Sequence, residues 1–223
     1  MSFQQLEKPM DRKMKLLVML ALLCSAIISR GQSSMTVSYE AGNAERNAFF
    51  NGAPVPDGNV AEIGYFTPGF DVTANANDLS ALNANWTQFD FTTFSQGVFW
   101  PANDGRFAAS ASSAAAGFDG KKISLWLFKT TDNAAPASGF GNVAGYGIFS
   151  STAANWFFPN RSGMPPFNTG VYSSEVDQAY HGTFDADTMN GHLYLNPVPE
   201  PATVALLGLA ATTLFVARWK KRA

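Results

Sequence analysis

The residue types that carry most enzyme chemistry are scarce in this chain. His181 and His192 are the only histidines, and neither stands in a His-x-x-x-His or Glu-x-x-His pattern typical of zinc ligands. Cys24 is the only cysteine, so the chain offers a single thiol for nucleophilic or redox chemistry. The sequence also lacks a Gly-x-Ser-x-Gly turn for an activated serine and a glycine-rich phosphate loop. We therefore predict a protein that is not an enzyme, with both imidazoles at the surface.

Carboxylates leave one catalytic alternative open. Residues 32–196 include fourteen acidic and six basic residues, and nothing in their spacing identifies a reactive pair. The acid and base of a glycosidase have no local sequence signature, because the fold alone brings them together. An exported polysaccharide hydrolase with an unidentified carboxylate pair is therefore the alternative to a non-enzymatic protein.

Two stretches rich in Asp and Asn offer oxygen ligands of the kind that calcium prefers. The candidate ligands are Asp71, Asn75, Asn77 and Asp78 in the first stretch and Asp185 and Asp187 in the second. Neither stretch fits the EF-hand template, since the second has Met189 at a ligand position. Turns and helix caps stabilised by the Asp and Asn side chains explain both stretches more simply. We therefore predict no cofactor, with calcium as the alternative that these residues leave open.

Aromatic residues are abundant between the two ends of the chain. Seventeen of the nineteen phenylalanines lie there, together with Trp86, Trp100, Trp126 and Trp156. Core packing accounts for most of them. Trp86 falls on the polar side of its predicted strand, where an exposed indole stacks well on a sugar ring. Trp86 is therefore the candidate for glycan binding.

The C-terminal segment, residues 197–223, combines three features in a fixed order. Val198, Pro199, Glu200 and Pro201 precede residues 202–217, a run of sixteen residues without a charge, and a basic tail follows. The bases of that tail are Arg218, Lys220, Lys221 and Arg222. A helix over 202–217 would be roughly 24 Å long, slightly short of a ~30 Å hydrocarbon core, and the tail extends it by snorkelling. We predict a transmembrane helix with the bases in the cytoplasm and residues 32–196 outside.

Proline is excluded from the interior of a helix and favours an extended conformation in the residue before it. Pro199, Glu200 and Pro201 are therefore expected to form an extended strip that a protease can bind. Together, the tripeptide, the short apolar run and the basic tail resemble the PEP-CTERM sorting signal of Gram-negative, biofilm-forming bacteria. The resemblance covers the C-terminal segment only. It implies recognition by an exosortase, an integral-membrane cysteine transpeptidase. It also implies transient insertion in the inner membrane, cleavage near the tripeptide, and delivery to the cell surface or extracellular polymer.

The N-terminal segment, residues 1–31, is typical of a secretory signal peptide. Lys13 and Lys15 precede residues 16–28, thirteen residues without a charge, which is too short a run for a membrane span. Small residues upstream place the cleavage between Gly31 and Gln32, and Met14 is a plausible true start. The predicted partners are the secretion translocon and signal peptidase. Cleavage would also remove Cys24, so the mature protein is expected to have no disulfide.

The charge distribution agrees with export. Residues 1–31 and 197–223 each carry a net charge of +3, whereas residues 32–196 carry −8. A nucleic-acid-binding protein needs a basic face, which the acidic body does not offer. Extracellular polysaccharide is the more suitable partner for a surface protein of this kind.

The body, residues 32–196, is predicted to be mainly β. Short strand-like runs alternate with Gly, Pro, Asn and Asp, which favours a β-sandwich, with a jelly roll as one form of it. The predicted strands are 36–39, 60–66, 86–91, 98–100, 106–112, 123–130, 146–150, 155–158 and 192–195. In the strand 86–91, Phe89 and Phe91 are expected on one face. One helix is predicted from Asp78 to Asn85, capped by Asn77 or Asp78, and residues 159–182 are predicted to be a long loop.

Overall fold

The computed structural model describes residues 33–42, 46–95, 102–162, 165–188 and 191–198, and these residues form a mainly β fold. The predicted signal peptide, its cleavage site at Gly31 and Gln32, and residues 199–223 lie outside the described residues, as does the predicted strand 98–100. No helix in the described part of the chain is long and apolar enough to span a membrane.

The helices and strands are short. The strands are β1 (Met35–Ala41), β2 (Asn47–Phe50), β3 (Ala53–Pro54), β4 (Val60–Phe66), β5 (Trp86–Thr93), β6 (Phe107–Ser113), β7 (Ser124–Thr130), β8 (Val143–Ser150), β9 (Asn168–Tyr172), β10 (Gln178–His181), β11 (Thr183–Phe184) and β12 (His192–Pro197). The helices are α2 (Leu79–Ala84) and the 3₁₀ turns η1 (Ala116–Phe118), η2 (Ser138–Phe140), η3 (Ala154–Trp156) and η4 (Ser173–Glu175).

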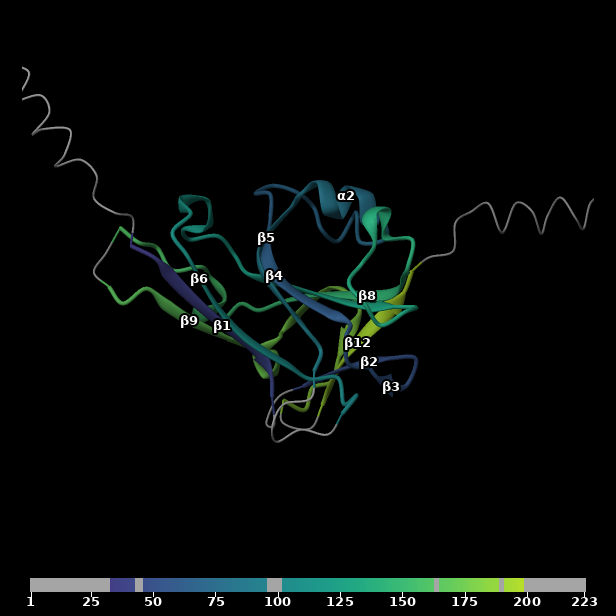
Figure 1. Ribbon diagram of the computed structural model, residues 1–223. Coiled ribbons are helices and arrows are strands. Elements are labelled where there is room, and N and C mark those ends of the chain that lie inside the picture. Colours follow the sequence, from purple (N-terminus) through teal and green to yellow (C-terminus); the bar gives the residue numbers. More distant parts are fainter. Residues whose placement is uncertain (1–32, 43–45, 96–101, 163–164, 189–190, 199–223) are drawn as a thin grey trace, which may run out of the picture. The chain divides into compact units, whose positions relative to one another are not determined.

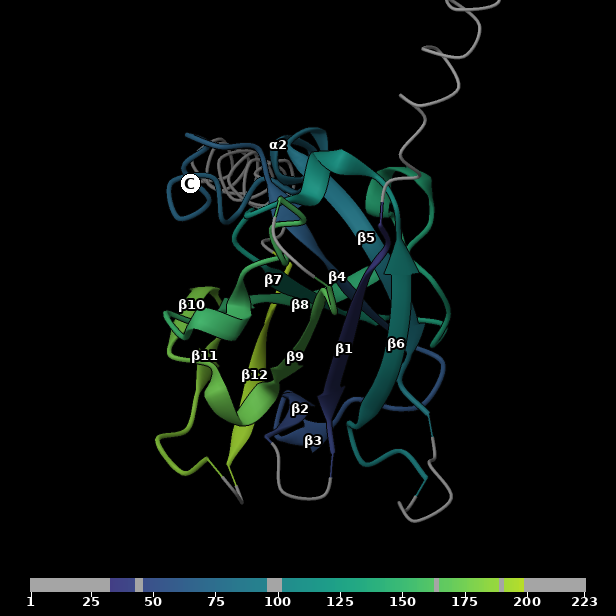
Figure 2. The same cartoon turned by 90° about the vertical axis from the view of Figure 1, so that its left-hand side faces the viewer.

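Two sheets are present in the body (Figures 1 and 2). The smaller has the strand order β6-β1-β9. The larger has the order β3-β2-β12-β8-β7-β4-β5, with β10 paired to β8 and β11 paired to β12. Two of the pairs, β1–β9 and β2–β12, are parallel, which departs from the antiparallel pattern of a jelly roll.

The main core lies between the two sheets, as in a β-sandwich. Alternate residues of β1, including Val37 and Tyr39, are fully buried and belong to the same apolar cluster as Ile63 of β4 and Leu125 of β7. Alternation along β6 is as predicted, with Phe107 buried and Ser110 and Ser112 outward. On the outer side of the smaller sheet, the hydroxyls of Thr36 and Ser112 lie 2.8 Å apart.

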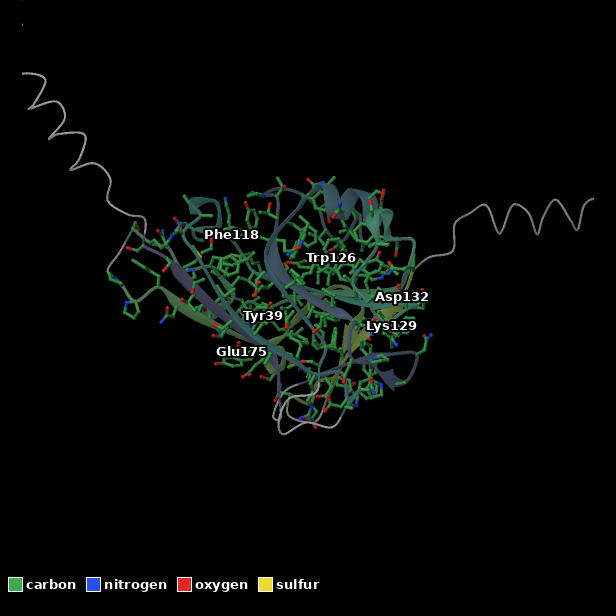
Figure 3. All side chains as sticks on the ribbon, in the orientation of Figure 1. Tyr39, Phe118, Trp126, Lys129, Asp132 and Glu175 are labelled. Atoms are coloured by element: carbon green, nitrogen blue, oxygen red, sulfur yellow. The ribbon has the colours of Figure 1, made fainter. Side chains whose placement is uncertain are left out.

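The larger sheet is also covered on its outer face, because β7 is apolar on both sides. Trp126 and Phe128 point away from the main core and pack in a second cluster with Leu82 of α2 and Tyr146 of β8. In Figure 3, Trp126 lies beneath α2, on the opposite side of the sheet from Tyr39. The prediction that β7 is a central strand covered on each side is confirmed.

The predicted helix is confirmed with its cap. Asp78 is the N-cap of α2, and its Oδ1 accepts a hydrogen bond of 2.9 Å from the backbone N–H of Ala81. A capping carboxylate satisfies one of the N–H groups that a helix start leaves without an internal partner.

Two local predictions are wrong. The segment predicted as a strand at 155–158 contains η3, because Trp156 turns into the main core instead of continuing an extended run. The segment predicted as a long loop, 159–182, contains β9, η4 and β10. Local Gly and Pro residues suggested a loop, but pairing with β1 and β8 holds parts of this segment extended.

A β-bulge changes which side chains of β5 face the main core. Ile63 pairs with Asp90 and Gly64 pairs with Gln88, so Phe89 is an extra residue in the strand. Phe89 and Asp90 therefore both point toward the main core, and Phe91 points outward opposite Glu62. The prediction that Phe89 and Phe91 share a face is wrong for this reason.

Candidate functional site

The outer face of the larger sheet brings a carboxyl group together with three aromatic rings. Glu62 of β4 pairs with Phe91 of β5 on one side and with Trp126 of β7 on the other. Trp86 completes the group, since its Nε1–H donates a 2.8 Å hydrogen bond to Oε2 of Glu62. We call these four residues the Glu62 cluster.

Gly64 makes room for this arrangement. A Cβ on Gly64 would lie 2.7 Å from the ring of Trp86 and 2.3 Å from the backbone oxygen of Thr87. The indole therefore lies close over the β4 backbone, where it also contacts Trp126 edge-on with ring centroids 5.4 Å apart. Trp126 is 1% exposed, and its Nε1 has no hydrogen-bond partner among the described residues. Of the two indoles, the one of Trp86 therefore holds Glu62 by a hydrogen bond.

Burial changes the acidity of Glu62. It raises the pKa of this carboxyl to about 7, although the hydrogen bond from Trp86 acts in the opposite direction. A carboxyl with this pKa is partly protonated at neutral pH, so it both donates and accepts hydrogen bonds. A hydroxyl group of a ligand is itself both a donor and an acceptor, so such a carboxyl can pair with it in either role.

Phe91 is the exposed member of the cluster. Its side chain is 54% exposed, compared with 41% for Phe157 and 37% for Tyr172, the other exposed large hydrophobic residues of the described part. Trp86, the residue predicted for glycan stacking, is half-buried against Phe66 and Trp126. Neither Glu62 nor Phe91 was predicted from the sequence as a site residue. An acid within the otherwise uncharged strand 60–66 was the available signal for Glu62.

A second carboxyl, Asp90, lies on the neighbouring strand but points to the other face. The hydroxyl of Tyr39 donates a 2.9 Å hydrogen bond to Oδ2 of Asp90, and Tyr39 is fully buried in the main core. Burial and this hydrogen bond raise the pKa of Tyr39 well above its usual range. Glu62 and Asp90 therefore lie on opposite faces of the larger sheet.

Replacing Glu62 with glutamine tests its burial through the pH dependence of stability. The unfolded carboxyl ionises near its ordinary pKa of 4.5, whereas the folded one ionises near 7. As the pH rises through this window, the unfolded state loses its proton first, so the wild-type free energy of unfolding falls. Glutamine stays neutral and can still accept from Trp86. The Tm of Glu62→Gln, relative to wild type, should therefore increase between pH 4.5 and about pH 8.

The matched control is Glu40→Gln, the same exchange on the smaller sheet, which is measured at the same pH values. A difference in Tm between Glu62→Gln and wild type that is constant across the pH range would contradict the proposed burial effect.

The two histidines do not form a metal site in the structure. His181 is buried and stacks on Tyr146 with ring centroids 4.1 Å apart, and burial lowers its pKa. The expectation of a surface imidazole is therefore wrong for His181. His192 stacks on Phe49 at 3.9 Å. Within the described residues, no group of three His, Cys, Asp or Glu side chains could hold a metal ion.

The proposed calcium ligands make internal hydrogen bonds. Oδ1 of Asp71 accepts from the N–H of Ala74, and Asn75 donates to the carbonyl of Asp71. Asp78 caps α2, and Asn77 lies exposed between these residues without bringing further acids to them.

In the second stretch, Oδ2 of Asp185 accepts from the N–H of His192 and the hydroxyl of Tyr194. The carbonyl of Asp187 accepts from Nε of Arg46. The structure thus assigns turn and cap roles to these residues, and calcium binding stays a prediction.

The predicted sorting segment begins inside the fold. Pro197 is the last residue of β12 and pairs with Gly145 of β8. The N–H of Val198 donates a 3.0 Å hydrogen bond to the carbonyl of Ala144, and its side chain packs against the second cluster, which contains Trp126 and Tyr146. The other predicted sorting residues, Pro199, Glu200, Pro201, Arg218, Lys220, Lys221 and Arg222, lie outside the described residues.

Comparison with known families identifies this segment. Residues 197–222 match the PEP-CTERM protein-sorting motif, which confirms the resemblance and its restriction to the C-terminal segment. The motif is that of an exported protein directed to the cell surface, and it implies an exosortase as the processing partner. No curated protein and no solved structure matches the chain.

Proposed function

Because its C-terminal segment is a PEP-CTERM sorting motif, we propose that this protein is a non-enzymatic structural or adhesive component of the cell surface or extracellular matrix. The sorting motif is the observation that carries the proposal, since it gives the destination. The body, residues 32–196, is then the part that acts there. We propose an extracellular polysaccharide as its ligand. The Glu62 cluster is the surface that supports polysaccharide binding.

The chemistry of the Glu62 cluster suits a sugar. Phe91 exposes an aromatic face, which packs on the C–H groups of a pyranose ring. Glu62 lies directly opposite Phe91 across the strand pair and offers a carboxyl that donates and accepts hydrogen bonds at neutral pH. A rigid sheet holds both groups, so binding would require little ordering of the protein.

The Phe91→Ala variant tests the glycan proposal. Secreted protein is run through native gels that contain the extracellular polysaccharide of the producing strain, and retardation relative to a polysaccharide-free gel gives the affinity. We expect Phe91→Ala to weaken binding about tenfold, which corresponds to ~1.4 kcal/mol. Glu62→Gln should weaken binding less, because the amide still forms hydrogen bonds with hydroxyl groups.

Two matched controls remove an exposed aromatic ring elsewhere. Phe157→Ala and Tyr172→Ala change the next most exposed aromatic side chains of the described part and should leave retardation unchanged. If all three alanine variants bind equally, or if wild type is not retarded, the glycan proposal fails while the sorting proposal is untouched.

One observation favours the alternative function, a polysaccharide hydrolase. A carboxyl with a pKa of about 7 is suited to act as a general acid at neutral pH, and Glu62 meets that requirement. Glycoside hydrolysis needs a second carboxylate across the same glycosidic bond, and Asp90 points to the other face of the sheet. The non-enzymatic proposal is therefore preferred. Release of reducing sugar by wild type but not by Glu62→Gln would reverse that preference.

A further inference from the structure

The strand that precedes the sorting motif is held in two different ways along its length. The first part of β12, His192–Leu195, pairs with β2, and Leu193 and Leu195 are buried in the main core. The last part, Asn196 and Pro197, pairs with β8 and is exposed to solvent. Figure 1 shows β12 beside β8. The core-facing half of the strand is therefore firmly anchored. The half next to the motif is weakly anchored in comparison, since Asn196 and Pro197 are exposed and Val198 is only half-buried, against the second cluster.

The sorting motif overlaps this weakly anchored end. The match begins at Pro197, so Pro197 and Val198 belong both to the motif and to the folded sheet. The hydrogen bond from Val198 to Ala144 occupies the backbone edge that an extended substrate would present to an enzyme. One backbone edge cannot pair with β8 and with a protease at the same time.

The distance to the membrane segment adds a second constraint. Only Pro199, Glu200 and Pro201 separate Val198 from the apolar run that begins at Ala202. Even fully extended, the chain from Val198 to Ala202 spans at most ~14 Å. A folded domain that holds Val198 therefore leaves a membrane enzyme little space around the tripeptide.

We infer that the end of β12, Asn196–Val198, separates from β8 before the sorting motif is processed, while Leu193 and Leu195 keep the domain folded. This inference rests on the proposed exosortase sorting. Local opening of a weakly held strand end costs much less free energy than global unfolding. The stability of the β12–β8 contact then sets how often the motif is accessible, and so it influences the rate of processing.

A disulfide between β12 and β8 tests this directly. Since Asn196 pairs with Tyr146 and Pro197 with Gly145, Val198 lies opposite Ala144 at a spacing that a disulfide can bridge. The double variant Ala144→Cys with Val198→Cys is expressed as the full chain in a host that has an exosortase. Its only other cysteine, Cys24, lies in the predicted signal peptide. Non-reducing gels separate crosslinked from uncrosslinked protein in the same sample.

We expect crosslinked protein to be processed at least about tenfold more slowly than uncrosslinked protein, with processing resuming when a reductant is added. The single variants Ala144→Cys and Val198→Cys are matched controls and should mature like wild type. Recovery after reduction shows that the disulfide itself caused the slower processing, and thermal unfolding of the crosslinked protein shows whether the domain is folded. Processing of the crosslinked form at the wild-type rate would overturn the inference.

A variant with Pro199, Glu200 and Pro201 changed to alanine distinguishes failure of the sorting proposal from failure of the strand-separation inference. If wild type and this variant yield the same products, the sorting proposal itself fails. If they differ but the crosslink has no effect on the rate, only the strand-separation inference fails.

Discussion

Changing Pro199, Glu200 and Pro201 together to alanine is expected to stop maturation and to leave full-length protein in the inner membrane. The two prolines exclude a helix and favour an extended strip, and Glu200 is the only charged residue between Val198 and Arg218. The change removes both properties and leaves residues 202–217 and the four terminal bases intact. The measurement is the size of the product in membrane, surface and medium fractions of a host that has an exosortase.

A matched control changes Thr212 and Thr213, inside the apolar run, to alanine and should mature normally.

Deleting Arg218–Arg222 should also impair sorting, but by a different route. Without the cytoplasmic charges the apolar run is no longer retained, and uncut protein is released. Normal maturation of the triple-alanine variant would refute sorting and reduce the C-terminal segment to a plain membrane anchor.

The largest effect on stability is expected from Trp156→Ala. Trp156 is fully buried in the main core, and its Nε1–H donates a 3.0 Å hydrogen bond to Glu175. Glu175 also accepts from Asn155, whose side chain reaches the carbonyl of Gly170 in β9. Replacing a core tryptophan with alanine typically costs ~3–5 kcal/mol, and in a domain of this size that lowers the Tm by roughly 6–20 °C.

Phe157→Ala is the adjacent control. The side chain of Phe157 is 41% exposed, and substitutions at such positions usually change the free energy of unfolding by less than ~0.5 kcal/mol. Thermal unfolding of secreted protein followed by near-ultraviolet circular dichroism gives both values. Equal losses of stability in the two variants would contradict the assignment of Trp156 to the core.

Sequence reasoning succeeded where a short segment carries its own information. The strand β7 was predictable because apolar residues on both faces require cover on both faces. Asp78 was predictable as a cap because it precedes the helix and its carboxylate satisfies a free N–H group. The sorting motif is equally local, since the tripeptide, apolar run and basic tail are adjacent in the chain.

It failed where a feature depends on partners far away in the chain. β9 follows a segment rich in Gly and Pro, and its parallel pairing with β1 has no local signal. The bulge at Phe89 is a property of the β4–β5 pair, so alternation within β5 alone assigned Phe91 to the wrong face. The Glu62 cluster needs three strands at once, and the raised pKa of Glu62 follows from the rings that surround it.

The position of β12 within the larger sheet has a consequence for the order of events during export. β12 fills the place between β2 and β8, although it is made by the last residues of the body. β2 and β8 are translocated before β12. Until β12 follows, the edges that it pairs with have no partner, and the main core lacks Leu193 and Leu195. Open edges and bare apolar surface favour aggregation. The body is therefore expected to complete its larger sheet and main core only when β12 has been translocated, just before the sorting motif reaches the membrane.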